Sequence, residues 1–559
     1  MKENATNAEL FKIGKLPKYV NSLVFSAYIA VIAIVMCFHE PWFDEAQSWL
    51  IARDSSFADL FLLRPHYEGH PPFWTLLLSI PAKTGVPYEI GIKSVQILCS
   101  AFFVGWLIFK SPLNRVATLL LPFTYFACFQ YGVTARPYAL LCAGLLITAS
   151  YWKERNFKPW KLTVSLGFLC LTSAYGIALA AGFALAWVID VALKNGLQKA
   201  VSEIIYNKQR LICWVTLTFV GILSIAVIWP ASDAFATRPT YDGNSQIIQW
   251  LSFLFVVPSE SAFTSFASDV SLRRLPLDLI PTIICVVVSL IMWAAIIQVS
   301  RRRKTLIATV IPYLALSVAA AKYFTLHHAG IVFVFFISQI WICAERKNFD
   351  FDDVPEFIKN IFNKTNKLSE SFTRILPIAL VVILLFPSLI WNVFACVNDI
   401  RFDYSGSREI ANYIAKNKVS NRRWMGSWFH TKQITDSTGE EIAPETNDLR
   451  QYSWQLVIAN PYFSRNLVSC NYKNSSFITN ELPTYEQAED EIMACATKKE
   501  SDYFVTDSKE PWYYFLALNY NIAHYNKADI VKVKTAWKSR LIQNDITIYK
   551  RGNSKNFVS

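Results

Sequence analysis

Residues 19–37 read YVNSLVFSAYIAVIAIVMC, an apolar run close to the roughly 20 residues that a helix needs to cross a bilayer. No small-residue cleavage site follows it, which favours a retained transmembrane helix over a signal peptide. The whole chain has the same character, since 53% of its 559 residues are hydrophobic, 17% are charged and the mean hydropathy is +0.28. These values predict an integral membrane protein.

Comparable apolar runs recur along most of the chain and predict an α-helical polytopic membrane protein with about 11–13 transmembrane helices. The run from Pro71 to Pro81 is too short to cross and is predicted to be a re-entrant or partly inserted helix. Two of the candidates are separated only at Tyr175–Gly176. The candidate spans are 18–38, 92–109, 112–129, 137–152, 161–175, 177–193, 211–230, 276–299, 305–321, 327–344 and 373–396.

The Lys and Arg residues indicate the orientation of these helices. Clusters such as Lys194 to Arg210 and Arg301 to Lys304 flank apolar runs, and cytoplasmic loops carry such an excess. With the N-terminus in the cytoplasm, the candidate crossings place these clusters inside, and place loops 39–70 and 231–275 and the tail outside. We therefore expect a multi-pass protein of the cytoplasmic (inner) membrane. The net charge of +12 then serves orientation and indicates no nucleic-acid partner.

From about residue 397 the composition becomes that of an ordinary water-soluble protein. We expect a transmembrane domain at 1–396 and an extracytoplasmic α/β domain at 397–559. Within the latter, helices are predicted from the Ser405–Ser407 cap to about Asn417 and over 485–497. The predicted strands are 455–459, 503–506, 530–537 and 546–549.

Most of the cysteines fall inside or at the ends of apolar segments, where they serve as small buried hydrophobic side chains. Cys470 and Cys495 alone lie in the polar C-terminal portion. On the outer side of a membrane these two either pair or remain as thiols.

The first external loop, residues 38–54, reads FHEPWFDEAQSWLIARD and gathers Glu40, Asp44 and Glu45 beside the end of a membrane helix. Carboxylates at a bilayer boundary are costly unless they are hydrated, paired or used. A carboxylate near apolar walls can act as the base that removes a proton from a hydroxyl group. The alternative is that Asp44 and Glu45 only cap the helix that follows.

The same loop ends in Tyr67–Trp74, which reads YEGHPPFW. Two prolines fit the first turn of a helix and fix how the chain enters the membrane, leaving Glu68 and His70 at the rim. An interfacial turn with an incidental Glu and His is the alternative. Binding of a divalent metal by Glu68 or His70 is a further alternative, which the residue pattern favours less. The sequence requires no cofactor.

Cationic groups follow on the same predicted face. Arg136, in QYGVTARPYAL, suits bidentate phosphate binding, or equally a structural ion pair with a loop carboxylate. Lys322, with His327 or His328, is a second polar island that suits phosphate. Adjacent histidines on a helix point in different directions, which disfavours a shared metal. The 231–275 loop either covers a lipid-linked donor or is an ordinary interface loop, and it holds Arg238, Trp250, Phe253, Phe255, Arg273 and Arg274.

Taken together, FDEAQSW after the first span, GHPP opening the next membrane segment and ARPY after a later span resemble the GT-C superfamily of integral-membrane glycosyltransferases. The resemblance is to the branch with protein O-mannosyltransferases and the aminoarabinose transferase of lipid A, and covers about residues 19–345. It implies a GT-C type fold. Two departures are Lys93, where the family often has arginine, and Thr172–Tyr175, where it has a Thr-His pair.

The resemblance also implies roles for single residues. Asp44 is the expected catalytic base, with Glu45 as its neighbour and second choice and Glu68 as a further acidic group. His70, with Pro71 and Pro72, matches the family's HPP segment. Arg136 and Tyr138 match the basic residue and tyrosine that face the carrier phosphate. Lys322, His327 and His328 complete the expected substrate-binding residues because of their own chemistry, since the resemblance assigns no role to them.

The expected function is inverting transfer of a hexose or pentose from a polyprenyl-phosphate carrier to an acceptor hydroxyl on the outer face. The expected acceptor is a glycan, glycolipid or protein in cell-surface polysaccharide or glycolipid synthesis. A transporter or flippase for lipid-linked sugars is one alternative, and it calls for charges along a path near the midplane. A polysaccharide polymerase or ligase is another.

Overall fold

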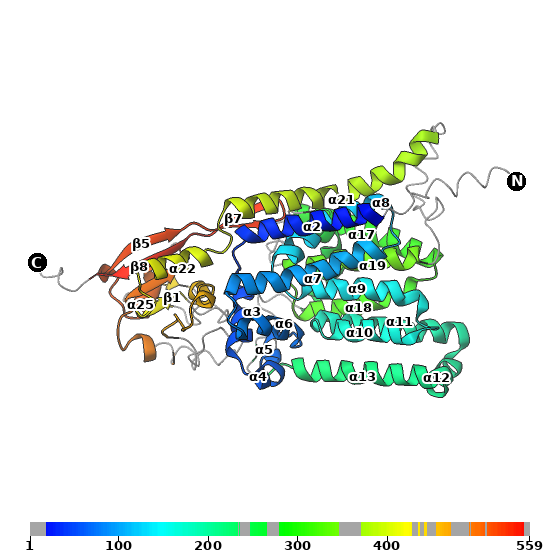
Figure 1. The fold of residues 1–559 in the computed structure, drawn as a ribbon, viewed down its shortest axis with the longest axis horizontal. Coiled ribbons are helices and arrows are strands. Elements are labelled where there is room, and N and C mark those ends of the chain that lie inside the picture. The colour runs from blue at the N-terminus through cyan, green and yellow to red at the C-terminus, as the bar shows by residue number, and fades with distance from the viewer. Residues whose placement is uncertain are drawn as a thin grey trace, which may run out of the picture.

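The computed structural model places a bundle of long helices beside a smaller group of strands near the C-terminus (Figure 1). The helices run side by side with similar axes, and the strands lie at one end of the bundle (Figure 1). The structure describes residues 18–232, 234, 246–264, 279–345, 370–427, 434–435, 441–443, 454–470, 491, 494–508 and 511–552.

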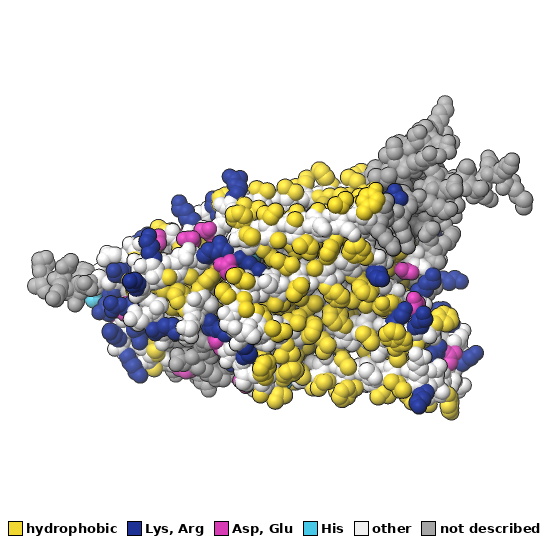
Figure 2. All heavy atoms as spheres, in the orientation of Figure 1, with side chains coloured by type: hydrophobic (Ala, Val, Ile, Leu, Met, Phe, Trp, Pro, Cys, Tyr) yellow, Lys and Arg dark blue, Asp and Glu magenta, His cyan; other side chains and the backbone are white. Residues whose placement is uncertain are grey.

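Among the described residues, seven helical stretches are long and apolar enough to cross a membrane, and each overlaps a predicted span. The apolar side chains cover the helical part of the visible face, with Lys and Arg toward its two ends (Figure 2). The chain is therefore a polytopic helical membrane protein. The seven stretches are α2 (Lys18–Phe38), α7 (Tyr88–Lys110), Arg115–Val133, α11 (Ala174–Asn195), α13 (Lys208–Ile228), α17 (Leu279–Arg302) and α21 (Glu370–Arg401).

The other four predicted spans coincide with shorter helices. At a rise of about 1.5 Å per residue, a 12-residue helix covers only about 18 Å of a hydrocarbon core of about 30 Å. By helix length alone, seven of the eleven predicted spans qualify as crossings. The shorter helices are α9 (Tyr138–Tyr151), α10 (Pro159–Cys170), α18 (Leu306–Lys322) and α19 (Ala329–Ala344).

The predicted break between two spans near Tyr175–Gly176 is present a few residues earlier, between Cys170 and Ala174. Ser173 caps α11, since its hydroxyl accepts the Gly176 N–H at 3.1 Å. A side chain at Gly176 would come within 2.2 Å of the Leu169 carbonyl oxygen, so the turn requires glycine. The helix reversal is therefore fixed by local sequence.

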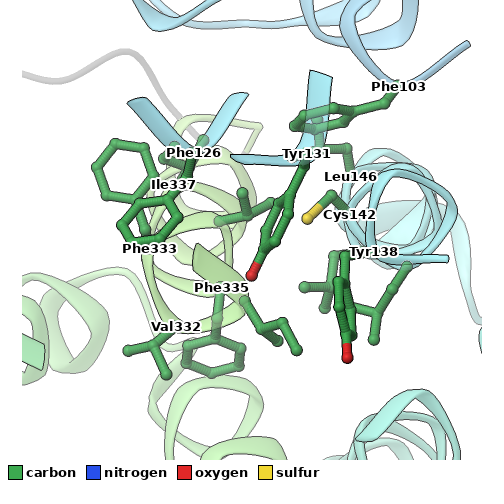
Figure 3. Packing of buried hydrophobic residues seen from close by; sticks show 14 of the residues in the cluster. Phe103, Phe126, Tyr131, Tyr138, Cys142, Leu146, Val332, Phe333, Phe335 and Ile337 are labelled. Carbon is green, nitrogen blue, oxygen red and sulfur yellow. The ribbon is translucent and has the colours of Figure 1, made fainter. Parts of the chain in front are cut away.

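The Arg115–Val133 stretch is irregular. It consists of α8 (Arg115–Leu120), the 3₁₀ turn η1 (Leu121–Phe123) and the π-helix η2 (Phe126–Val133). A π-helix is rare and often marks a functional region, and this one ends just before Arg136. Aromatic side chains of η2 pack with those of α9 and α19 in the bundle core (Figure 3).

Short helices fill the end of the bundle nearest the strands (Figure 1). The predicted re-entrant run is present as the 11-residue helix α6 (Phe73–Lys83), which packs on α3 (Phe43–Asp54). Between them lie α4 (Phe57–Leu62) and α5 (Pro65–Glu68). Further short elements are η3 (Trp152–Glu154), α12 (Leu197–Tyr206), α14 (Gln246–Phe255), α15 (Val257–Ala262) and η5 (Leu326–His328).

The strands after α21 form a four-stranded sheet in the order β1–β4–β8–β5, with β1 and β4 parallel and the other neighbours antiparallel. The strands are β1 (Trp424–Gly426), β4 (Tyr503–Thr506), β5 (Tyr525–Val531) and β8 (Ile546–Arg551). The other elements of this part are α22 (Ser407–Lys416), β2 (Ile434–Thr435), β3 (Glu441–Ala443), α23 (Trp454–Val457), η7 (Asn460–Tyr462), α25 (Trp512–Ala517) and η9 (Ile522–His524).

The helix after the Ser405–Ser407 cap and the strands over 503–506 and 546–549 are confirmed. The strand over 455–459 is wrong, since this buried run begins as α23, and a short apolar run does not distinguish strand from helix. The strand over 530–537 is two strands, because Val533 bridges to Asp403 between them. The helix over 485–497 falls largely outside the described residues. Cys470 and Cys495 form a disulfide.

The hairpin of β6 (Lys534–Trp537) and β7 (Arg540–Gln543) reaches from the strands into the bundle. The Lys538 ammonium at its turn is fully buried, 2.7 Å from a carboxylate oxygen of Glu260 and 4.4 Å from the centre of the Trp391 ring. It also donates to the Thr264 carbonyl oxygen at 2.8 Å. The hairpin thus joins α15 and α21 through one buried cation.

We expect Lys538→Met to lower the free energy of unfolding by about 3–5 kcal/mol, because it leaves the Glu260 carboxylate buried without its cation. Thermal unfolding of the purified protein in detergent measures the loss. Lys534→Met is the matched control, since Lys534 lies over the Phe402 ring in the same hairpin and its loss should cost about 1 kcal/mol or less. Equal destabilisation by both substitutions would contradict a central role for the buried pair.

Candidate active site

All the predicted site residues except Lys322 come from four segments that meet at the end of the bundle nearest the strands (Figure 1). The ring of Tyr138 lies 6.2 Å from that of His70 and 5.9 Å from that of His327, centre to centre. His327 also meets Trp42, just before α3, at 5.9 Å. The segments are the start of α3 with Asp44 and Glu45, the α5–α6 turn with Glu68 and His70, the η2–α9 junction with Arg136 and Tyr138, and η5 with His327 and His328.

Asp44 and Arg136 form an ion pair, with 3.4 Å between the guanidinium and the carboxylate. The guanidinium also donates to the Asp44 carbonyl oxygen at 3.3 Å. Although burial alone would lower it, the pKa of Arg136 is raised because Asp44 and Tyr138 favour the cation. The Asp44 side chain remains 25% exposed, so its carboxylate is both paired and reachable.

Glu45 is placed differently from Asp44, because only 1% of it is exposed. One carboxylate oxygen accepts the Trp42 N–H at 3.0 Å, at the start of α3. The other accepts the Ala135 N–H at 2.6 Å. Glu45 therefore matches the alternative in which a loop carboxylate caps the start of α3.

Glu68 and His70 are held by the turn between α5 and α6. Gly69 has a φ of 64°, in the left-handed region that favours glycine, and this lets the chain reverse. The Glu68 carboxylate accepts from Gln47 at 2.6 Å, and burial raises the pKa of Glu68 to about 7. Glu68 thus changes charge near neutral pH.

His70 presents a lone pair. Its Nδ1–H donates to the Glu68 carbonyl oxygen at 2.6 Å, so its Nε2 is unprotonated in the neutral ring. Burial and nearby Arg136 lower the pKa of His70 to about 4, which keeps the ring neutral. The Nε2 is buried and has no hydrogen-bond partner among the described residues, so it is suited to accept from a substrate hydroxyl.

His328 lies behind Tyr138. Its Nδ1 accepts the Thr325 N–H at 3.0 Å, which leaves Nε2–H to donate to the Tyr138 oxygen at 2.7 Å. The Tyr138 hydroxyl proton is therefore directed to a different acceptor. The His327 ring lies between those of Tyr138 and Trp42 at 5.9 Å from each, and burial lowers its pKa to about 4.

A pocket that is partly open to solvent adjoins these groups. Asp44 is connected to its wall through Arg136, whereas Lys322 is exposed at the end of α18 and is not among the lining residues. Arg64, Ser48 and Thr75 line it without having been predicted, since no motif marks them. The full lining is Ser48, Arg64, Pro65, Glu68, His70, Pro71, Trp74, Thr75, Arg136 and Pro137.

Lys93 and Tyr175, at the two positions that depart from the GT-C motif pattern, each make a polar contact in the structure. Lys93 pairs with Glu89, which also accepts from Arg408 and from the Tyr462 hydroxyl. The Tyr175 hydroxyl donates to the Tyr323 carbonyl oxygen at 2.6 Å. Among the described residues, no three His, Cys, Asp or Glu side chains are grouped as a metal site.

The described part of the 231–275 loop packs against the bundle. Trp250 donates to the Ser317 hydroxyl at 2.9 Å, and the ring of Phe253 stacks on that of Tyr313 at 5.2 Å. These contacts favour ordinary packing for the two aromatic residues. Arg238, Arg273 and Arg274 fall outside the described residues.

No protein-family model and no curated protein match the chain. A cryo-EM structure of arabinofuranosyltransferase AftD from Mycobacteria is similar with a TM-score of 0.39 and 11% identity, over 97% of this chain and 40% of that one. A structure of arabinosyltransferase EmbB from Mycobacterium smegmatis is similar with a TM-score of 0.32 and 12% identity, over 76% and 46%. This chain thus spans less than half of either. TM-scores this low do not establish a shared fold, so function is inferred from the site.

The ionisation of Glu68 should control anion binding in the pocket. Above its pKa of about 7 Glu68 adds a negative charge beside Arg136, so the affinity for an anion should fall about tenfold from pH 6 to pH 8. A short-chain prenyl-phosphate sugar is the probe, because a phosphodiester keeps one charge over this range. Titration calorimetry with Glu68→Gln should show tight binding at both pH values. The same pH dependence in this variant would assign it to another group.

Proposed function

We propose that this protein is a GT-C type glycosyltransferase that moves a sugar from a polyprenyl-phosphate carrier to an acceptor hydroxyl. The observation that carries the proposal is the partly exposed Asp44 carboxylate, which is paired with Arg136 beside a pocket lined by Arg64, Glu68 and His70. A base, cations for phosphate and groups for sugar hydroxyls are the components that this transfer needs. They lie at the end of an apolar bundle, where a lipid carrier presents its phosphate.

In the proposed reaction Asp44 removes the proton from the acceptor hydroxyl. The acceptor oxygen bonds to the anomeric carbon while the bond from that carbon to the phosphate oxygen breaks. The electron pair leaves with the polyprenyl phosphate, and its charge is stabilised by Arg136 and Arg64. A single displacement inverts the anomeric centre.

His70, which lines the pocket, and Tyr138, whose ring lies near that of His70, are proposed to orient the sugar. His70 accepts from a sugar hydroxyl through its free Nε2, and Tyr138 donates through the proton that His328 leaves to it. Lys322 and His327 stay predicted substrate-binding residues, with Lys322 at the exposed end of α18.

The site is proposed to face the outside of the cytoplasmic membrane. The Cys470–Cys495 disulfide supports this side, because disulfides persist in oxidising compartments. The acceptor is then a surface glycan, glycolipid or exported protein. A transporter is less well supported, since the site's charges gather at one end of the bundle instead of following a path across it.

The test is transfer from radiolabelled polyprenyl-phosphate sugars by protein reconstituted in liposomes. Asp44→Asn should lower kcat by at least about 100-fold, the effect expected on losing a general base. Asp54→Asn is the matched control on the same helix, where Asp54 pairs with Arg53, and should retain the parent rate. Transfer at the parent rate in Asp44→Asn would rule out this base. Movement of the lipid between leaflets without turnover would favour a transporter.

A further inference from the structure

A chain of buried ionic contacts runs behind the Asp44–Arg136 pair. It begins at Asp399 in α21, whose two carboxylate oxygens lie 3.0 and 3.1 Å from the Nδ1 of His39. The Nε2 of His39 lies 3.2 Å from a carboxylate oxygen of Glu45. Residues 360 positions apart in the sequence are thereby joined.

The geometry defines the charges of Asp399, His39 and Glu45. Carboxylates accept hydrogen bonds, and each ring nitrogen of His39 faces one, so the imidazole carries two protons and donates on both sides. Burial alone would lower the pKa of His39, but Asp399 and Glu45 together raise it to about 10. His39 is therefore a cation at neutral pH.

Glu45 connects this cation to the site. Its carboxylate accepts the N–H of Ala135, directly before Arg136, and the N–H of Trp42, directly before the helix that carries Asp44. One side chain thus holds both backbone segments whose side chains form the ion pair. Any shift of Glu45 changes the separation of Asp44 and Arg136.

We propose that Asp399, His39 and Glu45 are positioning residues that set the geometry of Asp44 and Arg136 for transfer without touching substrate. The side chains of all three are at most 1% exposed, and both oxygens of Glu45 are occupied by protein donors. This assignment rests on the proposed function. It also gives Glu45 a role different from that of an alternative base.

The chain of contacts also connects the site to the C-terminal part of the protein. Asp399 lies in the last turns of α21, and the N–H of Gly406, soon after α21 ends, donates to the Glu40 carboxylate at 2.7 Å. Glu40 directly follows His39 in the loop. These two neighbouring residues therefore link the site to the start of the C-terminal part.

The test compares His39→Gln, Asp399→Asn and the double variant in the transfer assay. Each single change should lower kcat about 10- to 100-fold, since a displacement of about 1 Å in a site has effects of this size. The double variant should be no slower than the slower single one, because both break one network. Asp190→Asn is the control. It breaks a different buried ion pair, between Asp190 near the C-terminal end of α11 and Arg155, and should keep the parent kcat.

A second readout follows the Ala135 amide by hydrogen exchange in the intact protein. His39→Gln and Asp399→Asn should each speed its exchange at least tenfold, although neither residue touches Ala135, whereas Asp190→Asn should not. Parent kcat per folded molecule in both variants would overturn the proposal. Unchanged exchange of the Ala135 amide in both variants would also overturn it. So would a loss of kcat that occurs only in Glu45→Gln and equals the loss in Asp44→Asn. If the parent protein transfers no sugar, the proposed function fails and the exchange result alone decides the positioning role.

Discussion

Hydrocarbon offers no partners for charged groups, and this constraint explains where the polar side chains of this protein lie. Among the described residues, buried charges form ion pairs such as Glu260 with Lys538 and Arg155 with Asp190. The groups left with exposed surface or free hydrogen-bonding capacity, such as Asp44 and His70, lie at the bundle end. In the proposed function, a lipid-borne phosphate would meet a water-borne hydroxyl at this end of the bundle.

Much of the helical architecture was predictable because hydrophobic length is a strong signal. The run over 18–38 coincides with α2, and the short run after Pro71 is α6. The C-terminal part was harder. The buried run at 455–459 contains no periodicity that separates helix from strand, and the break at Val533 depends on a bridge to Asp403, far away in the sequence.

The candidate site residues also divide into those that the local sequence marks and those that it does not. Asp44, Glu68, His70 and Arg136 were identified because polar groups between apolar runs are conspicuous, and the structure brings them together. Arg64 was not, because an arginine in a polar loop carries no such signal. The pairing of His39 with Asp399 was also out of reach, since a contact across 360 residues leaves no local pattern.

The hairpin that carries Lys538 has a consequence for biogenesis. Glu260 is synthesised 278 residues before the lysine that neutralises it. Until Lys538 is synthesised, the Glu260 carboxyl group lacks its cation, and the Trp391 ring lacks the lysine that later lies over it. The helices can insert one after another as they emerge, but the contact between Glu260 and Lys538 forms only after the β6–β7 hairpin has been synthesised. One buried contact of the helical bundle therefore depends on a segment that the C-terminal part supplies.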